Sequence, residues 1–111
     1  MATISNLYVD AGATYSNIIT VTASNGAALN LTGYSVASQM RKSYQSSTAY
    51  AFTASVYDAA NGKIRLQLTD TASAAIPAGR WLYDVEITSG SGTKTRVVEG
   101  IVTVNPQITQ I

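Results

Sequence analysis

The sequence predicts an all-β protein, a seven-stranded antiparallel β-sandwich of immunoglobulin-like character with one short helical turn near residues 70–76. Seven stretches of alternating apolar and polar residues follow one another along the 111 residues. Clusters of turn-forming residues separate them at spacings of roughly 8 to 15 residues, which is typical of sandwiches and barrels. A small closed barrel is the competing architecture, and the length suits a single domain spanning residues 1–111.

The first three strands are expected at residues 4–9, 14–23 and 34–41. The first two segments are rich in β-branched and aromatic residues, and the turn cluster Asp10-Ala11-Gly12 separates them. Asn25-Gly26 predicts a reversal before the third strand, because this dipeptide adopts positive φ at low cost. In the third strand, alternation places four side chains on one face: Tyr34, Val36, Ser38 and Met40.

The fourth and fifth strands are expected at residues 50–57 and 63–69, joined as a hairpin through Asn61-Gly62. The fifth has the clearest alternation of the chain. Its predicted inward side chains are Ile64, Leu66 and Leu68, and its outward ones are Lys63, Arg65 and Gln67. The fourth strand aligns Tyr50, Phe52, Ala54 and Val56 in the same way.

A single helical turn is expected next, with Thr69 or Asp70 as its N-cap and Pro77 preventing its continuation. The sixth strand covers residues 80–88 and forms the predicted centre of the core through Trp81, Tyr83, Val85 and Ile87. Gly90-Ser91-Gly92 forms a tip before the last strand at residues 94–104. Residues 105–111 are expected to form a C-terminal extension.

Three pairs of neighbouring apolar residues break the alternation, and they define the candidate interface: Ile18, Ile19, Val97, Val98, Ile101 and Val102. A sandwich strand with one hydrated face should not have apolar side chains on both faces. Either a loop of the same chain covers the outer ones or another chain buries them. Charged residues make up only 12% of the sequence, against roughly 25% in ordinary soluble domains. We therefore favour burial by another chain, although isolated surface Val and Ile need no partner.

The reactive groups of common enzymes are absent, so no catalytic residue, cofactor or metal site is expected. Without His or Cys, the Ser-His-Asp and Cys-His arrangements cannot form. Among the six carboxylates only Asp84 and Glu86 share a strand face by spacing, and exposed charges of this kind commonly pair with neighbours such as Arg96 or Lys94. No glycine-rich phosphate loop and no loop with the oxygen spacing of a calcium site are found.

Nucleic acid and membranes are not expected as partners. A net charge of +1 does not provide the excess positive charge that binding to a phosphate backbone needs. No window approaches the ~18 consecutive apolar residues of a membrane span, and the first residues lack the basic segment and apolar stretch of a secretory leader. We expect the protein to be made in a cytoplasm and used without export by that route.

Carbohydrate binding is the alternative function, because the sequence has seven Tyr and one Trp and exposed rings on a sandwich face can stack on sugars. Most of these aromatic residues fall on the inward phase of their strands, where core packing is the simpler role. Tyr15 and Tyr44 are the candidates for exposure and glycan contact.

Four segments resemble the small all-β domains of tailed-bacteriophage virion proteins and are similar to the N-terminal domain of baseplate upper proteins: residues 11–16, 29–41, 64–71 and 77–87. The resemblance implies a non-enzymatic virion component that assembles with itself or with a larger phage protein. Its place would be the tail or baseplate, the neck or collar, or the head surface as a capsid decoration (cement) subunit. Longer members of this group have a receptor-binding or fibre segment after this domain. Its absence here favours a connector, collar or decoration subunit.

Overall fold

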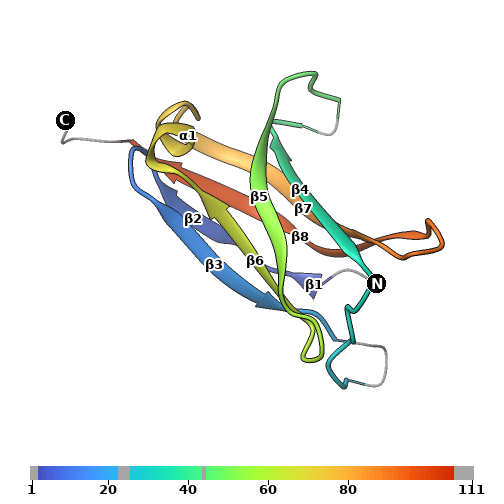
Figure 1. The fold of residues 1–111 in the computed structure, drawn as a ribbon. Coiled ribbons are helices and arrows are strands. Elements are labelled where there is room, and N and C mark those ends of the chain that lie inside the picture. The colour runs from blue at the N-terminus through green and yellow to red at the C-terminus, as the bar shows by residue number, and fades with distance from the viewer. Residues whose placement is uncertain (1–2, 23–25, 44, 107–111) are drawn as a thin grey trace.

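The computed structural model describes residues 3–22, 26–43 and 45–106, and its strands lie in two packed layers (Figure 1). The elements, in chain order, are β1 (Thr3–Ile4), β2 (Leu7–Asp10), β3 (Tyr15–Thr20), β4 (Ser35–Arg41), β5 (Ala49–Asp58), β6 (Lys63–Leu68), α1 (Asp70–Ala74), β7 (Gly79–Thr88) and β8 (Lys94–Asn105). The strand order is β1-β8-β7-β4-β5-β6-β3, and β2 also pairs with β8.

Strand β5 belongs to both layers. Its first half pairs with β4 through residues 49–52, and its second half pairs with β6 through residues 53–58. The first layer therefore contains β1, β2, β8, β7 and β4, and the second contains the rest of β5 with β6 and β3. Because β3 pairs only with β6 in the described part of the chain, the two layers do not close into a barrel there.

The predicted all-β sandwich is confirmed, but the prediction that all strands are antiparallel is wrong. Both β1 and β2 run parallel to β8, with Thr3 opposite Val98 and Leu7 opposite Val102. Alternation of apolar residues is the same in parallel and antiparallel strands, so the sequence pattern could not show the direction. The immunoglobulin-like character remains a prediction. Residues 107–111 of the predicted extension lie outside the described residues.

The predicted helical turn is confirmed as α1, and it fixes the connection between β2 and β3. The Thr69 side chain caps it by accepting a hydrogen bond from the Ala72 amide at 3.1 Å. The buried Ser73 hydroxyl donates to the Ala13 carbonyl at 2.7 Å and accepts from the Gly12 amide at 3.1 Å. This side chain thus satisfies two backbone groups at the point where the chain passes between layers.

In the ranges described, no helix is long and apolar enough to span a membrane.

The core lies between the two layers, and the predicted inward phases are confirmed for β6 and β7. Ile64, Leu66 and Leu68 are buried, as are the four alternate side chains of β7 from Trp81 to Ile87. Aromatic rings of β5 and β7 pack against each other in the core: Phe52 meets Tyr83 with centroids 6.1 Å apart, and Tyr50 meets Trp81 edge-on at 5.3 Å. Offset and edge contacts of this kind are the favoured ring geometry.

The N-terminal strand is interrupted at Ser5, between β1 and β2, where its backbone lies close against Gly100 of β8. The Ser5 amide donates to the Glu99 carbonyl at 2.9 Å, and the Asn6 side-chain oxygen accepts from the Ile101 amide at 3.1 Å. The Ser5 carbonyl accepts a hydrogen bond from the hydroxyl of Tyr83, whose pKa burial raises to about 12. A Cβ at position 100 would overlap this carbonyl. This close backbone approach therefore requires glycine at position 100.

We expect Gly100→Ala to lower the free energy of unfolding by about 1–3 kcal/mol, because the added methyl must displace backbone that is held by three hydrogen bonds. Gly90→Ala is the matched control, since a Cβ there meets nothing closer than 3.9 Å and neither glycine has positive φ. Urea unfolding of both variants measures the difference. Equal stability of the two variants would show that the contact between Ser5 and position 100 tolerates a side chain.

Candidate interaction surfaces

The outer face of the first layer has a hollow of about 580 Å³, which we call the outer-face hollow. Strand register arranges its side chains in rows across the layer. One row runs from Gln39 through Asp84 to Glu99, and Ile4 of β1 lies opposite Glu99 at its end. The next row contains Arg41, Leu82 and Ile101. The hollow therefore has a polar row beside a partly apolar one.

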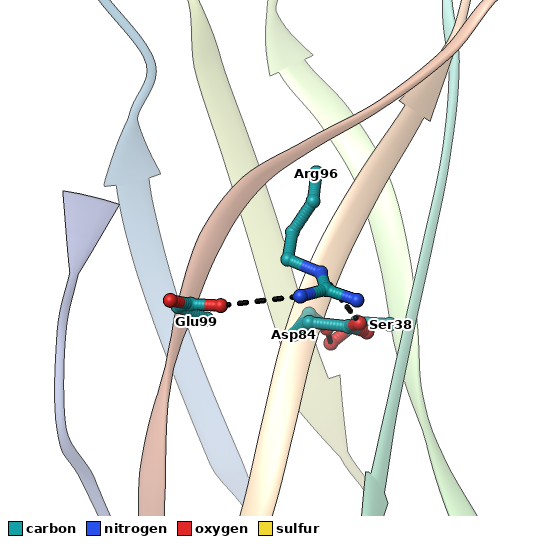
Figure 2. Close-up of polar contacts among 4 residues, drawn as sticks. All are labelled: Ser38, Asp84, Arg96 and Glu99. Carbon is teal, nitrogen blue, oxygen red and sulfur yellow. Dashed lines mark hydrogen bonds and ion pairs between the residues drawn. The ribbon is translucent and has the colours of Figure 1, made fainter. Parts of the chain in front are cut away.

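Arg96 lies between two carboxylates at this surface (Figure 2). Its Nε is 3.2 Å from Asp84 Oδ2, and one of its terminal nitrogens is 3.3 Å from Glu99 Oε2. The predicted pairing of Asp84 with Arg96 is therefore present. Burial and the nearby Glu86 raise the pKa of the Asp84 carboxyl above its ordinary value, and Arg96 acts in the opposite direction. The Ser38 hydroxyl donates to the backbone carbonyl of Asp84 at 2.6 Å, which fixes the strand beneath.

The hollow offers acceptor oxygens, two guanidinium groups and a few aliphatic side chains. In the described ranges, no group of three or more Asp and Glu residues is arranged to hold a metal ion. The carboxylates of Asp84 and Glu99 are engaged by Arg96, whereas Glu86 is exposed and has no ion pair in the described part of the chain. Such groups suit recognition of a protein surface by hydrogen bonds and charge. The absence of enzymatic activity stays a prediction.

The structure separates the six predicted interface residues into three pairs. Val98 and Val102 are 1% and 0% exposed and belong to the core, so the prediction that they form an outer interface is corrected. Ile19 and Val97 are partly buried against the core. The remaining two side chains point outward, with Ile18 at 43% exposure and Ile101 at 37%. For these two the interface role stays a prediction.

A β-bulge explains the pair Val97-Val98. Val98 lies opposite Val85 and Arg96 lies opposite Glu86, so Val97 has no opposite residue in β7. A bulge inserts one extra residue and resets the alternation on either side of it. Two apolar neighbours therefore pack against the same core, and the sequence pattern alone could not distinguish this from a strand with two apolar faces.

Two exposed apolar side chains of the N-terminal strand were not predicted as interface residues. Ile4 is 74% exposed and Tyr8 is 69% exposed, and register places both on the outer face of the first layer. The signal was available in the sequence, because Tyr8 lies between the inward residues Leu7 and Val9. On the second layer, the exposed Tyr57 ring lies under the guanidinium of Arg65, 4.4 Å from the ring centroid.

The structure does not place Tyr15 as an exposed glycan platform. Its ring is partly buried and lies 5.9 Å from that of Phe52, at a tilt of 45°. Burial raises the pKa of its hydroxyl, and a hydrogen bond with the Asn17 side chain acts in the opposite direction. Tyr44, the other candidate, lies outside the described residues.

Comparisons with known proteins support the fold. No family model and no curated protein matches the sequence. Among solved structures, the N-terminal domain of phage TP901-1 ORF48 is similar, with a TM-score of 0.63 and 14% identity over 91% of this chain and 85% of that one. A structure from a study of cell-adhesive interactions of VGSC β subunits matches with a TM-score of 0.47 and 12% identity, over 92% of both chains. The first likeness confirms the resemblance to a phage domain at the level of the fold.

We expect Val98→Asp and Ile101→Asp to differ sharply in stability. The first places an unpaired charge in the core and should lower the free energy of unfolding by about 3–5 kcal/mol. The second changes an outward side chain and should cost less than about 1 kcal/mol. Thermal unfolding followed by circular dichroism compares them. A stable Val98→Asp variant would contradict the assignment of this residue to the core.

We expect Arg96→Ala to be destabilising at pH 7 by about 0.5–1 kcal/mol and nearly neutral at pH 3. Because the pKa of Asp84 is raised, protonation of this carboxyl stabilises the fold, and that stabilisation is lost as pH rises through the pKa. Removing Arg96 leaves the ionised Asp84 carboxylate without its cation at pH 7, whereas at pH 3 Asp84, with its raised pKa, is largely protonated. Urea unfolding at both values measures this, with Arg80→Ala as control, since Arg80 makes no ion pair in the described ranges. An equal effect at both values would contradict the role of the charges.

Proposed function

We propose that this protein is a non-enzymatic structural component of a bacteriophage particle. The observation that supports it most directly is the fold, which matches a phage domain over 91% of the chain. The four sequence segments that resemble small virion domains also support it. They include the turn residues 77–79 and the strand from Arg80 to Ile87.

The character of the surface also supports an assembly role. Ile4, Tyr8 and Ile101 are exposed together on the outer face of the first layer, beside the carboxylates and arginines of the outer-face hollow. Neighbouring exposed apolar side chains with a polar rim are typical of protein interfaces. We infer that this face contacts another phage protein or another copy of the chain. The proposed locations are the tail or baseplate, the neck or collar, and the head surface as a decoration subunit.

Mass spectrometry of gradient-purified particles tests this proposal. We expect the chain to be present at a fixed ratio to the major capsid protein through successive purification steps. A Tyr8→Asp variant supplied in place of the normal protein should be incorporated less, because it places a charge on the proposed contact face. Thr53→Asp is the control, since Thr53 is exposed on the opposite layer. Absence of the unmodified chain from purified particles would refute the proposal.

A further inference from the structure

Strand β3 presents one unpaired row of backbone groups. It forms the end of the second layer, and in the described residues its only strand partner is β6. The Val21 amide donates to the Gly62 carbonyl at 2.7 Å, and the β3–β6 register continues directly into this pair. Hydrogen-bonded pairs alternate along antiparallel strands, so Ile19 and Asn17 bond to β6 as well. The N–H and C=O groups of Ser16, Ile18 and Thr20 therefore point away from the layer.

This edge lacks the features that usually prevent pairing between molecules. Residues 15–20 include no Lys, no Pro and no charged side chain, and their pairing with β6 shows no bulge. Natural proteins commonly protect edge strands with one of these devices. The opposite end of the sheet differs, because there the edge strand is broken at Ser5 into two short pieces. An open, uncharged edge of six residues is suited to strand addition.

We propose that β3 pairs with β3 of a second copy of this chain, antiparallel and about a two-fold axis at Ile18. In this register, Ser16 meets Thr20 of the partner subunit, Ile18 meets the partner's Ile18, and Thr20 meets the partner's Ser16. All three residues whose backbone groups point outward are then paired with residues of the second copy whose backbone groups also point outward. Each pair exchanges two hydrogen bonds. The pairing joins β5, β6 and β3 of both copies into one continuous layer. It specifies the self-assembly part of the proposed function.

Side chains and charges favour a second copy at this edge. Ile18 is 43% exposed, and in the proposed register the two Ile18 residues lie about 5.5 Å apart on the same face, where each covers the other. Arg65 lies opposite Ile18 on β6, so the two Arg65 positions are three strand spacings apart, or about 14 Å. That distance exceeds the Debye length of about 8 Å at physiological salt. Repulsion between these two cations is therefore largely screened.

Light scattering coupled to size-exclusion chromatography tests the inference with the full chain. We expect a concentration-dependent dimer whose Kd rises about tenfold or more in Ile18→Pro. Proline removes the outward N–H of residue 18 but spares the bonds from residues 17 and 19 to β6, so the domain should still fold by circular dichroism. Thr53→Lys, on the same face but in an interior strand, is the control and should dimerise normally.

Two variants with opposite charges at position 18 test the pairing separately from folding. Ile18→Lys and Ile18→Glu should each weaken the dimer through like charges across the two-fold axis, and mixing them should restore a heterodimer. An unmodified chain that is monomeric at every concentration, or an Ile18→Pro variant that dimerises normally, would overturn the proposed pairing. A monomer found in purified particles would refute this inference alone, whereas a dimer absent from them would refute the virion role alone.

Discussion

Strand β5 exchanges neighbours half-way along its length, and both the surfaces and the edges of the molecule follow from this. Its first residues continue the layer that holds β4, β7 and β8, and its later residues continue the layer that ends at β3. A strand that turns a corner in this way allows a small sandwich to be one sheet. It also leaves the second layer only three strands wide. The outer-face hollow and the free edge of β3 therefore lie on different layers and are available to different partners.

The other end of the sheet depends on a second constraint, the absence of a side chain at Gly100. Because Gly100 has no side chain, the Ser5 carbonyl can point inward to the Tyr83 hydroxyl. The residues on either side of Ser5 keep their alternation. Ile4 and Tyr8 consequently face outward beside Ile101, while Leu7 and Val9 enter the core. Pairing with β8 thus determines which side chains of β1 and β2 reach the surface. The apolar part of the proposed contact face therefore depends on how β1 and β2 pair with β8.

Much of the fold was predictable because alternation records which way a side chain points. The strands, the inward residues of β6 and β7, and the capped turn at Thr69 follow from that pattern and from local propensity. Strand direction and neighbours did not follow, since a parallel β2 has the same alternation as an antiparallel one. The bulge at Val97 places two apolar neighbours against the core, and Val98 keeps the same inward phase as Val102 and Val104. Of the six candidate interface residues, Ile18 and Ile101 are exposed, whereas Ile4 and Tyr8, which are more exposed, were not among the six.

The parallel pairing of β1 and β2 with β8 also has a consequence for synthesis. The Ile101 amide bonds to Asn6, 95 residues earlier in the chain, so the first strands have no partner until the ribosome has made the last one. Contacts between residues so distant in sequence form slowly. During translation the apolar residues of β1 and β2 therefore stay without this strand partner until β8 has been made.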